Sequence, residues 1–429
     1  MFQKKCVLLV VVFFHFTAAL GVTSPRSFDM MVVNDIHLNV SQPHAMSLTP
    51  SSRDPKNDMD VATFSRLINT TKSFIRNGLM GKVDTVLLLG DCVGHRTVPQ
   101  RFTAVTSDLT SVFSNLPAIT FASTASAQWI YSFGNNDSLS ADYGPFVTKQ
   151  TSPWTVAEHS TVISGGAWGS GFYPMLLDCN KAQGKHWPCQ LHPSSGISPS
   201  KYGLSVVRLH HHLELINFND IPLSMLAHRK SSLHTPAVLA WLNKALADAE
   251  LNGNRVIISM HIPLGQNVYD GSQFLSSSGL SALLAILHRY HHSIVALLSA
   301  HTHMTEFKVI RYQNHPLIAQ LISPGMSTSH GNAASFSLYH FTQDSNGLWQ
   351  LMNMKTFRYA SLNKVIAVMN MRSAYGCPAN LSLPQCLFKK TLNMKELTQR
   401  FSTFYLNGNP HLATPSFDVT QLKHVFVDI

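Results

Sequence analysis

Short apolar runs recur along this 429-residue chain and limit the folds that it can adopt. Each run is rich in Val, Ile and Leu and has the length of a buried β-strand. All but the third stop at a polar residue that could do chemistry. We therefore predict buried strands at these positions. The runs are residues 28–35 (FDMMVVND), 84–91 (DTVLLLGD), 213–220 (LELINFND), 255–261 (RVIISMH) and 293–301 (SIVALLSAH).

Between these runs, apolar residues recur at helical spacing in three places. The set that begins at Val238 follows Pro236, a residue suited to the first turn of a helix. Strands that alternate with helices indicate an α/β fold. The three predicted helical faces are Phe64, Leu67, Ile68, Thr71 and Ile75; Val238, Trp241, Leu242, Ala245 and Ala249; and Leu280, Leu283, Leu284 and Leu287.

The alternation of strands and helices stops near Leu362, which indicates a change of organisation. Beyond it lie a cysteine pair, a helical stretch over residues 394–404 and a polar tail. We predict a main domain over residues 22–345 and a small, mostly helical C-terminal subdomain over residues 346–429.

The first 21 residues, MFQKKCVLLVVVFFHFTAALG, have the layout of a secretory signal peptide. Two lysines precede an apolar run that is short for a membrane span, and small residues follow it. We expect cleavage near Gly21 or Ala19, and a secreted or periplasmic mature protein without a transmembrane segment. The alternative is an uncleaved N-terminal anchor.

Loss of the leader would remove Lys4 and Lys5, so the formal net charge would fall by two, from +10 to +8. The remaining basic residues are scattered, without a Lys/Arg tract or interleaved aromatic residues. Binding of nucleic acid through a basic patch is therefore disfavoured.

Two close cysteine pairs remain after the leader. In an exported chain each pair can close a short loop, so we predict the disulfides Cys179–Cys189 and Cys377–Cys386, with Cys92 as a free thiol. A zinc site made of cysteines is less suited to these spacings, because none is Cys-x-x-Cys.

Polar residues gather at the ends of the predicted strands, where functional groups collect in an open α/β sheet. Imidazole and carboxylate together suit zinc, iron or manganese. Seven ligands are too many for one tetrahedral ion but suit two ions that share a carboxylate. Such a pair can clamp a phosphoryl group and activate a water molecule. The seven candidate ligands are Asp35, His37, Asp91, Asn135, His261, His301 and His303.

The order Asp-x-His, Gly-Asp, Gly-Asn, His and His-x-His resembles the calcineurin-like metallophosphoesterases. The stretches GDCVGH, VIISMHIPLG, AHTHMTEF and LISPGMSTSHGNAASFSLYHF resemble the acid sphingomyelinase-like phosphodiesterase branch of that superfamily. The resemblance covers residues 28–345. It implies a four-layer α/β/β/α sandwich that hydrolyses phosphodiester or phosphoanhydride bonds with two divalent transition-metal ions, zinc first and iron or manganese as alternatives.

The same resemblance implies a division of the ligands between two ions, with Asp91 shared. It also implies that His95 faces the substrate phosphate, where it could stabilise negative charge or protonate the leaving oxygen. The implied ligands are Asp35, His37, Asp91 and His303 for the first ion, and Asp91, Asn135, His261 and His301 for the second.

Two residues depart from the pattern of this branch. Ala300 replaces a glycine, a small change. Asn136 replaces a second phosphate-facing histidine, and an asparagine cannot serve as a general acid. We expect His95 to take over this role, or the substrate to have a better leaving group, such as a nucleotide pyrophosphate.

The residues before Asp35 leave little room for the saposin-like lipid-presenting domain of acid sphingomyelinase. We therefore expect nucleotides or other soluble phosphodiesters as substrates. Three alternatives stay open: a sphingomyelin or phospholipid phosphodiesterase, a polyphosphate or phosphomonoester hydrolase, and a binding protein that keeps the metal fold without turnover.

Overall fold

The structure, a computed structural model, describes residues 26–54, 57–80, 83–95, 108, 111–112, 128–138, 141–145 and 204–429. The predicted leader and the predicted Cys179–Cys189 disulfide lie outside the described residues.

Six strands form the first sheet. Its spatial order is β12-β11-β10-β1-β2-β3. Strands β1, β2 and β3 run parallel, whereas β10, β11 and β12 are joined by antiparallel pairing. The carboxyl ends of the three parallel strands therefore meet at one edge of the sheet. The strands are β1 (Ser27–Val33), β2 (Thr85–Leu89), β3 (Gln128–Ser132), β10 (Ser335–Gln343), β11 (Trp349–Ser361) and β12 (Lys364–Asn370).

Seven strands form the second sheet, in the order β13-β8-β9-β7-β6-β5-β4. Strands β5, β6, β7 and β9 run parallel, so this sheet also gathers carboxyl ends at one edge. The strands are β4 (Ser205–His210), β5 (Leu213–Asn217), β6 (Arg255–Ser259), β7 (Ile294–Ser299), β8 (Glu306–Tyr312), β9 (His315–Ile322) and β13 (Phe426–Asp428).

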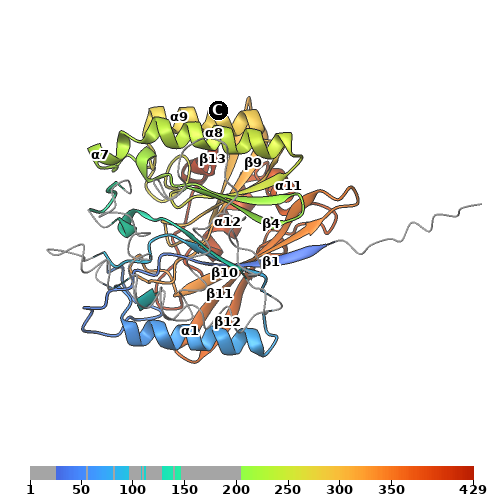
Figure 1. Cartoon of the computed structure of the whole chain (residues 1–429). Helices are drawn as coiled ribbons and strands as arrows, with labels where there is room; N and C mark the ends of the chain where they lie inside the picture. The colour runs from blue at the N-terminus through green and yellow to red at the C-terminus, as the bar shows by residue number, and fades with distance from the viewer. Residues whose placement is uncertain are drawn as a thin grey trace, which may run out of the picture.

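The three long helices lie on the outer faces of the two sheets. In Figure 1, α1 covers the outer face of the first sheet, and α8 with α9 covers the outer face of the second. The mixed α/β fold with two sheets flanked by helices is thereby confirmed. The helices are α1 (Val61–Arg76), α7 (Arg229–Ser232), α8 (Thr235–Leu251), α9 (Ser277–Tyr290), α10 (Met371–Ala374), α11 (Leu383–Lys390), α12 (Met394–Phe404) and α13 (Val419–Leu422), with 3-10 turns η1 (Asn135–Asp137), η3 (Ile221–Leu223) and η4 (Lys423–Val425).

Local chemistry explains why the three long helices form where the sequence predicts them. Helix α1 begins at Asp60, whose side chain accepts a hydrogen bond from the Thr63 amide at 2.9 Å, a stabilising N-cap. Helix α9 begins in the same way at Ser276, and α8 carries Pro236 in its first turn. The predicted apolar faces of all three helices are buried, apart from Leu280, which is only partly buried against the core.

The five predicted strands correspond to β1, β2, β5, β6 and β7, so each is confirmed. Two strands that the sequence analysis did not predict follow Leu362: β12 extends the first sheet, and β13 pairs with β8 in the second. Both are edge strands. Only two of the seven residues of β12 are buried, so it lacks the continuous apolar run of a buried strand.

Helices α10 to α13 lie between β12 and β13, and α12 has the predicted bounds. A disulfide joins Cys377 to Cys386, and Cys92 is free and buried. Both predictions are confirmed for these three cysteines.

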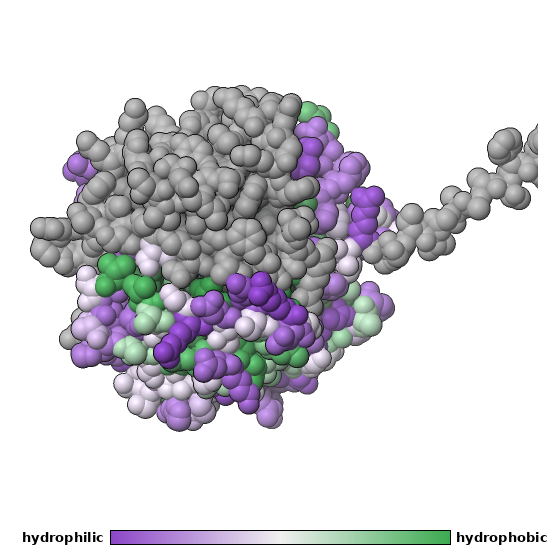
Figure 2. All heavy atoms as spheres, turned by 60° about the horizontal axis from the view of Figure 1, so that its bottom comes forward, coloured by the Kyte–Doolittle hydropathy of each residue, from purple (hydrophilic) through white to green (hydrophobic). Residues whose placement is uncertain are grey.

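The surface on the α1 side is mainly hydrophilic, with scattered hydrophobic residues, as expected for the outer layer of a sandwich (Figure 2). Across the described ranges, no helix has both the length and the apolar character needed to cross a membrane.

Candidate metal centre

All seven predicted ligands follow parallel strands at the edge where both sheets gather their carboxyl ends. They come after β1, β2 and β3 of the first sheet and after β6 and β7 of the second. Asp35 and His303 are 268 positions apart in sequence and follow strands of different sheets. The fold nevertheless places both at the same site.

Five of these seven residues have a left-handed backbone, which non-glycine residues seldom adopt. Each such residue costs on the order of 1–3 kcal/mol, and this kind of strain gathers at functional sites. The chain turns sharply after each strand, and the strained residues are the ones with metal-binding side chains. The φ angles are 46° at Asp35, 45° at His37, 50° at Asp91, 71° at His301 and 63° at His303.

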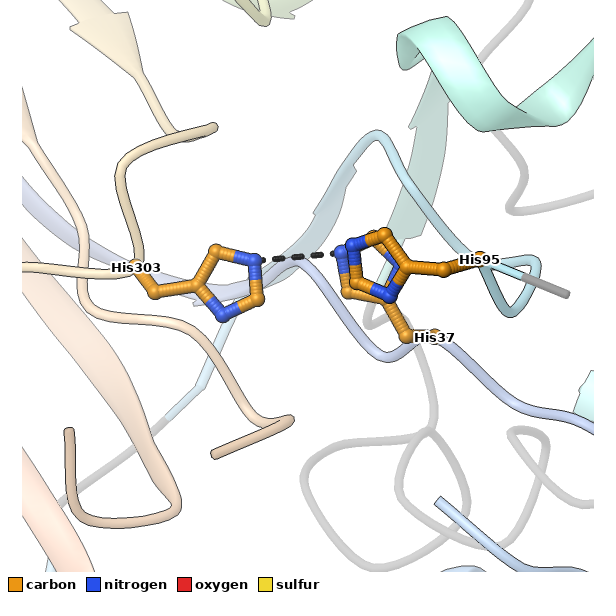
Figure 3. A group of neighbouring side chains, drawn as sticks. All are labelled: His37, His95 and His303. Atoms are coloured by element: carbon orange, nitrogen blue, oxygen red, sulfur yellow. Dashed lines mark hydrogen bonds between the residues drawn. The ribbon is translucent and has the colours of Figure 1, made fainter. Parts of the chain in front are cut away.

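His37 and His303 face each other with their Nε2 atoms 3.1 Å apart (Figure 3). The Nδ1 atom of His37 lies 3.1 Å from the Val93 carbonyl oxygen, and that of His303 lies 3.2 Å from the Ser327 carbonyl oxygen. A carbonyl can only accept, so Nδ1 carries the proton in both rings. Two Nε2 lone pairs therefore point at each other, an arrangement that a cation between or beside them would stabilise.

His261 also directs its Nε2 atom toward Asp91. Its Nδ1 donates to the Leu89 carbonyl oxygen at 2.9 Å, and its Nε2 atom lies 3.3 Å from Oδ2 of Asp91. Burial would lower the pKa of His261, but the charge of Asp91 outweighs it and raises this pKa to about 10, so the site favours positive charge at this point. In the described part of the chain this Nε2 atom is fully buried and has no hydrogen-bond partner. The Nε2 atom of His37 lies 3.7 Å from the same carboxylate oxygen, so Asp91 sits between two imidazoles.

Asp35 is fully buried, and its two oxygens have different surroundings. Oδ2 accepts a hydrogen bond from Asn34 Nδ2 at 2.6 Å, while Oδ1 lies 3.9 Å from Nε2 of both His261 and His303. Burial raises the pKa of Asp35 to about 7, and the charge of Asp91 contributes to the rise. Two close buried carboxylates favour the presence of positive charge between them.

Burial opposes ionisation of Asp91 as well, but the neighbouring imidazoles, His261 first, outweigh it and lower the pKa of this carboxyl. Burial and the charge of His261 lower the pKa of His301 to about 3. The two groups thus favour the carboxylate and the neutral imidazole, the forms that bind metals.

Asn135 and Asn136 form different hydrogen bonds. The Nδ2 atom of Asn135 donates to Asp142 Oδ1 at 2.8 Å, and its buried Oδ1 atom has no hydrogen-bond partner within the described ranges. Asn136 instead binds Asp91, with its backbone N 2.8 Å from Oδ1 and its Nδ2 2.9 Å from Oδ2. Asn135 thus offers a free amide oxygen, and Asn136 fixes the carboxylate that is predicted to be shared.

The ligand atoms of the candidate residues form three compact groups, each with its atoms within 4.8 Å of one another. Buried nitrogen and oxygen atoms without partners, on a set of imidazoles, carboxylates and one amide, fit divalent zinc, iron or manganese. The groups are His37, His95 and His303; Asp91, His261 and His301; and Asp35, His37 and Asp91.

His95 stacks on His37, with ring centroids 3.8 Å apart and planes at 12° (Figure 3). Its Nδ1 atom lies 2.8 Å from Asp58 Oδ1, and its side chain keeps 27% exposure. Burial alone would lower the pKa of His95, but the hydrogen bond and charge of Asp58 outweigh it, so the pKa is raised. No sequence pattern marks Asp58, because it lies in the loop between β1 and α1, which has no periodic residues.

A cavity of about 510 Å³ opens onto these residues. Its walls include several side chains that the sequence analysis did not single out. Those side chains are Arg53, Asp142, Tyr143, Leu226, Asn267, Tyr269, Asp270, Phe274, Thr302, Met304, His330 and Tyr405.

Comparison with known proteins gives a family match and distant structural likenesses. The family described as calcineurin-like phosphoesterase matches residues 28–305. No curated protein matches the chain.

Three solved structures illustrate the structural likenesses. A dimetal phosphatase from Danio rerio is 11% identical, with a TM-score of 0.42, over 80% of this chain and 98% of that chain. A putative 5'-nucleotidase from Staphylococcus aureus is 10% identical, with a TM-score of 0.40, over 86% and 59%. The NAD nucleotidase of Haemophilus influenzae is 11% identical, with a TM-score of 0.36, over 94% and 60%.

Proposed function

The chain belongs to the calcineurin-like phosphoesterase family, and from that premise we propose that it is a secreted, two-metal phosphodiesterase of the acid sphingomyelinase-like type. Its substrates would be nucleotides or other soluble compounds with a phosphodiester or phosphoanhydride bond. The observation that carries the proposal is the inward direction of three imidazole Nε2 atoms, those of His37, His303 and His261, toward the carboxylates of Asp35 and Asp91.

We assign the residues around Asp91 to two metal ions. Bound divalent ions would supply Lewis-acid charge and lower the pKa of a water molecule enough for it to attack phosphorus at neutral pH. The carbonyls of Leu89, Val93 and Ser327 hold three of the imidazoles in the tautomer required for binding. The first ion would be held by Asp35, His37, Asp91 and His303, and the second by Asp91, Asn135, His261 and His301.

His95 is suited to supply a proton to the leaving oxygen. Its Nδ1 atom is engaged by Asp58, its ring is fixed by stacking on His37, and its side chain reaches the cavity. The raised pKa favours the protonated form, which can donate the proton or stabilise negative charge. Asn136 cannot donate a proton in this way, and its amide binds Asp91.

Export is supported by the leader-like sequence of residues 1–21 and by the Cys377–Cys386 disulfide, which is typical of oxidising compartments. Detection of the processed protein outside the cytoplasm of its source cells would support export. A full-length chain retained inside them would contradict it.

A phospholipid or sphingomyelin substrate is the second candidate, and one observation favours it. Leu226 lines the cavity and is 68% exposed, and its neighbour Met225 is 54% exposed. Exposed apolar side chains at the mouth of a site can contact lipid. Hydrolysis of sphingomyelin in mixed micelles would support this alternative.

The main test compares bis-p-nitrophenyl phosphate with p-nitrophenyl phosphate, before and after removal of metal with a chelator. We expect faster hydrolysis of the diester, loss of activity with the chelator and recovery when Zn²⁺ or Mn²⁺ is restored. Preference for the monoester would favour a phosphomonoesterase. Two bound ions without turnover of either substrate would favour the binding protein.

A further inference from the structure

Arg53 places an unneutralised charge on the wall of the candidate catalytic cavity. Its side chain is exposed, and its guanidinium carbon lies 4.4 Å from the ring centroid of Tyr269. Among the residues that the structure describes, Arg53 has no ion-pair partner. A guanidinium offers five donors in a planar fork and remains charged at any physiological pH, so it is suited to a phosphate.

The Arg53 side chain is held from two directions. Its Cγ atom lies close to Gly331, where an added Cβ would come within 3.0 Å of it. Its guanidinium stacks on Tyr269, whose amide donates to Asn267 Oδ1 at 2.9 Å and whose carbonyl accepts from Gln421 Nε2 at 3.1 Å. Both ends of the side chain are therefore positioned before any ligand binds, which lowers the entropic cost of binding.

Within the described ranges, no acidic residue on the cavity wall forms an ion pair with Arg53, and Asp91 instead faces His37 and His261. Asp142 accepts a hydrogen bond from Asn135, and Asp270 accepts two from Ser272, at 2.9 and 2.7 Å. Neither carboxylate forms an ion pair with Arg53 within the described ranges.

The anchor of Arg53 is also linked to the candidate metal centre. Gly331 directly follows His330, whose ring centroid lies 4.3 Å from that of His303 and 6.2 Å from that of His95. All of these side chains except the glycine line the same cavity. A phosphate compound that extends from the centre along this wall would reach Arg53.

We propose that Arg53, positioned by Tyr269 and Gly331, forms a second anion subsite that selects substrates with a second phosphate beside the one to be cleaved. This inference rests on the proposed function and names its substrate class as phosphoanhydrides, such as nucleoside diphosphates. In the reaction, the oxygen of water forms a bond to phosphorus and the bridging P–O bond breaks. The departing phosphate keeps the electron pair of the broken bond, and a proton from the water passes to this phosphate or to solvent. Arg53 binds the negative charge of the departing phosphate.

The test uses the metal-loaded full chain with Arg53→Ala and Arg53→Lys, on ADP and on bis-p-nitrophenyl phosphate. Loss of a charge-assisted hydrogen bond should raise KM for ADP by about 10–100-fold and change kcat little. KM for the diester, which has a single anionic phosphate, should stay within about twofold, since Arg53 would not contact it. Arg53→Lys should restore part of the loss, because lysine keeps the charge without the fork.

A binding measurement separates this inference from the proposed function. Calorimetric titration with inorganic pyrophosphate should show weaker binding to Arg53→Ala than to the wild type, with binding of orthophosphate unchanged. If the wild type hydrolyses neither substrate, the proposed function fails, and the titration still decides whether the subsite exists. Arg66→Ala, an exposed change on α1 away from the cavity, is the matched control. Equal pyrophosphate affinity of the wild type and Arg53→Ala, or equal loss on both substrates, would overturn the subsite.

Discussion

The Nδ1 atom of His95 lies 2.8 Å from Oδ1 of Asp58, a carboxylate without exposure to solvent. The other oxygen of Asp58 accepts a hydrogen bond from Asn39 Nδ2 at 3.3 Å, so the carboxylate is itself held in place. This contact fixes the orientation of His95 and favours its protonated form, while its Nε2 atom is left for the cavity.

Replacing His95 with alanine should lower turnover of an unactivated phosphodiester by about 10²–10⁴-fold, the usual range for the loss of a general acid. The loss should be smaller for p-nitrophenyl esters, because p-nitrophenolate leaves without a proton. Metal content, measured by elemental analysis, should not change, because the assigned ligands remain. Wild-type turnover by His95→Ala on the unactivated substrate would exclude the acid role.

Asp58→Asn should lower the same turnover by a smaller factor, because His95 is kept but loses its charged partner. Its effect should disappear in the His95→Ala background, since Asp58 would act through His95 alone. Steady-state kinetics of the four proteins in this cycle measures the coupling. Additive losses would show that Asp58 acts by another route.

Replacing His261 with alanine should remove the second ion together with activity. The ring lies 3.3 Å from Asp91 through a buried Nε2 atom that has no hydrogen-bond partner among the described residues. Elemental analysis should give two ions per wild-type chain and one per variant chain. His315→Ala, an exposed change at the start of β9, should keep both ions and full activity. One ion or none in the saturated wild type would contradict the two-metal assignment.

Asn136→Ala should weaken metal binding without removing a proposed ligand. It deletes the 2.9 Å hydrogen bond from Nδ2 to Asp91 Oδ2 and leaves the backbone contact intact. Partners that orient metal ligands are typically worth about 10–100-fold in affinity. Competition with a chromophoric chelator should reveal this loss. The exposed Asn363→Ala is the control, and equal affinity of the two variants would show that Asn136 does not support the centre.

All the candidate ligands except Asn135 could be found from the sequence because each lies at or just after the end of an apolar run, and the carboxyl ends of parallel strands share one edge. Asp58 and Arg53 could not be found in this way. They lie in the loop between β1 and α1, where no periodicity marks which side chains turn inward. Their roles depend on long-range contacts with His95 and Tyr269, which only the folded chain brings close.

The missed strands have a related cause. β13 has three residues and pairs with β8, which lies more than 110 residues earlier in the chain. Such a short edge strand is stabilised by its partner rather than by its own residue pattern. The parallel β3 was missed because QWIYS mixes polar and apolar residues instead of forming a run.

The Cys377–Cys386 disulfide closes a loop with a sequence separation of 9. Replacing both cysteines with serine should lower the free energy of unfolding by about 2–4 kcal/mol, on the chain-entropy estimate for a short loop. Chemical denaturation of wild type and variant measures the difference. Reduction with dithiothreitol should destabilise the wild type more than the variant, because the variant keeps only the predicted Cys179–Cys189 bond.

Lys308 is a buried lysine without any solvent exposure, on β8. Its Nζ atom donates to the carbonyl oxygens of Gln266 at 2.5 Å and His424 at 2.9 Å, so it ties β8 to two other segments. Burial lowers the pKa of Lys308 from 10.5 to about 8, although the charge of Glu306 opposes the change.

This pKa predicts a change of stability with pH. Between about pH 8 and 10.5 the unfolded chain keeps the lysine proton while the folded chain has lost it, so the free energy of unfolding rises with pH. Relative to Lys308→Met, wild-type protein should gain up to about 3 kcal/mol across this range, since each pKa unit corresponds to about 1.4 kcal/mol. Urea denaturation at several pH values measures the two slopes.

Lys355→Met, at an exposed position on β11, should retain the wild-type slope, because its charge is solvated in both states. A Lys308→Met variant whose stability rises with pH as steeply as that of the wild type would show that Lys308 stays charged in the folded protein.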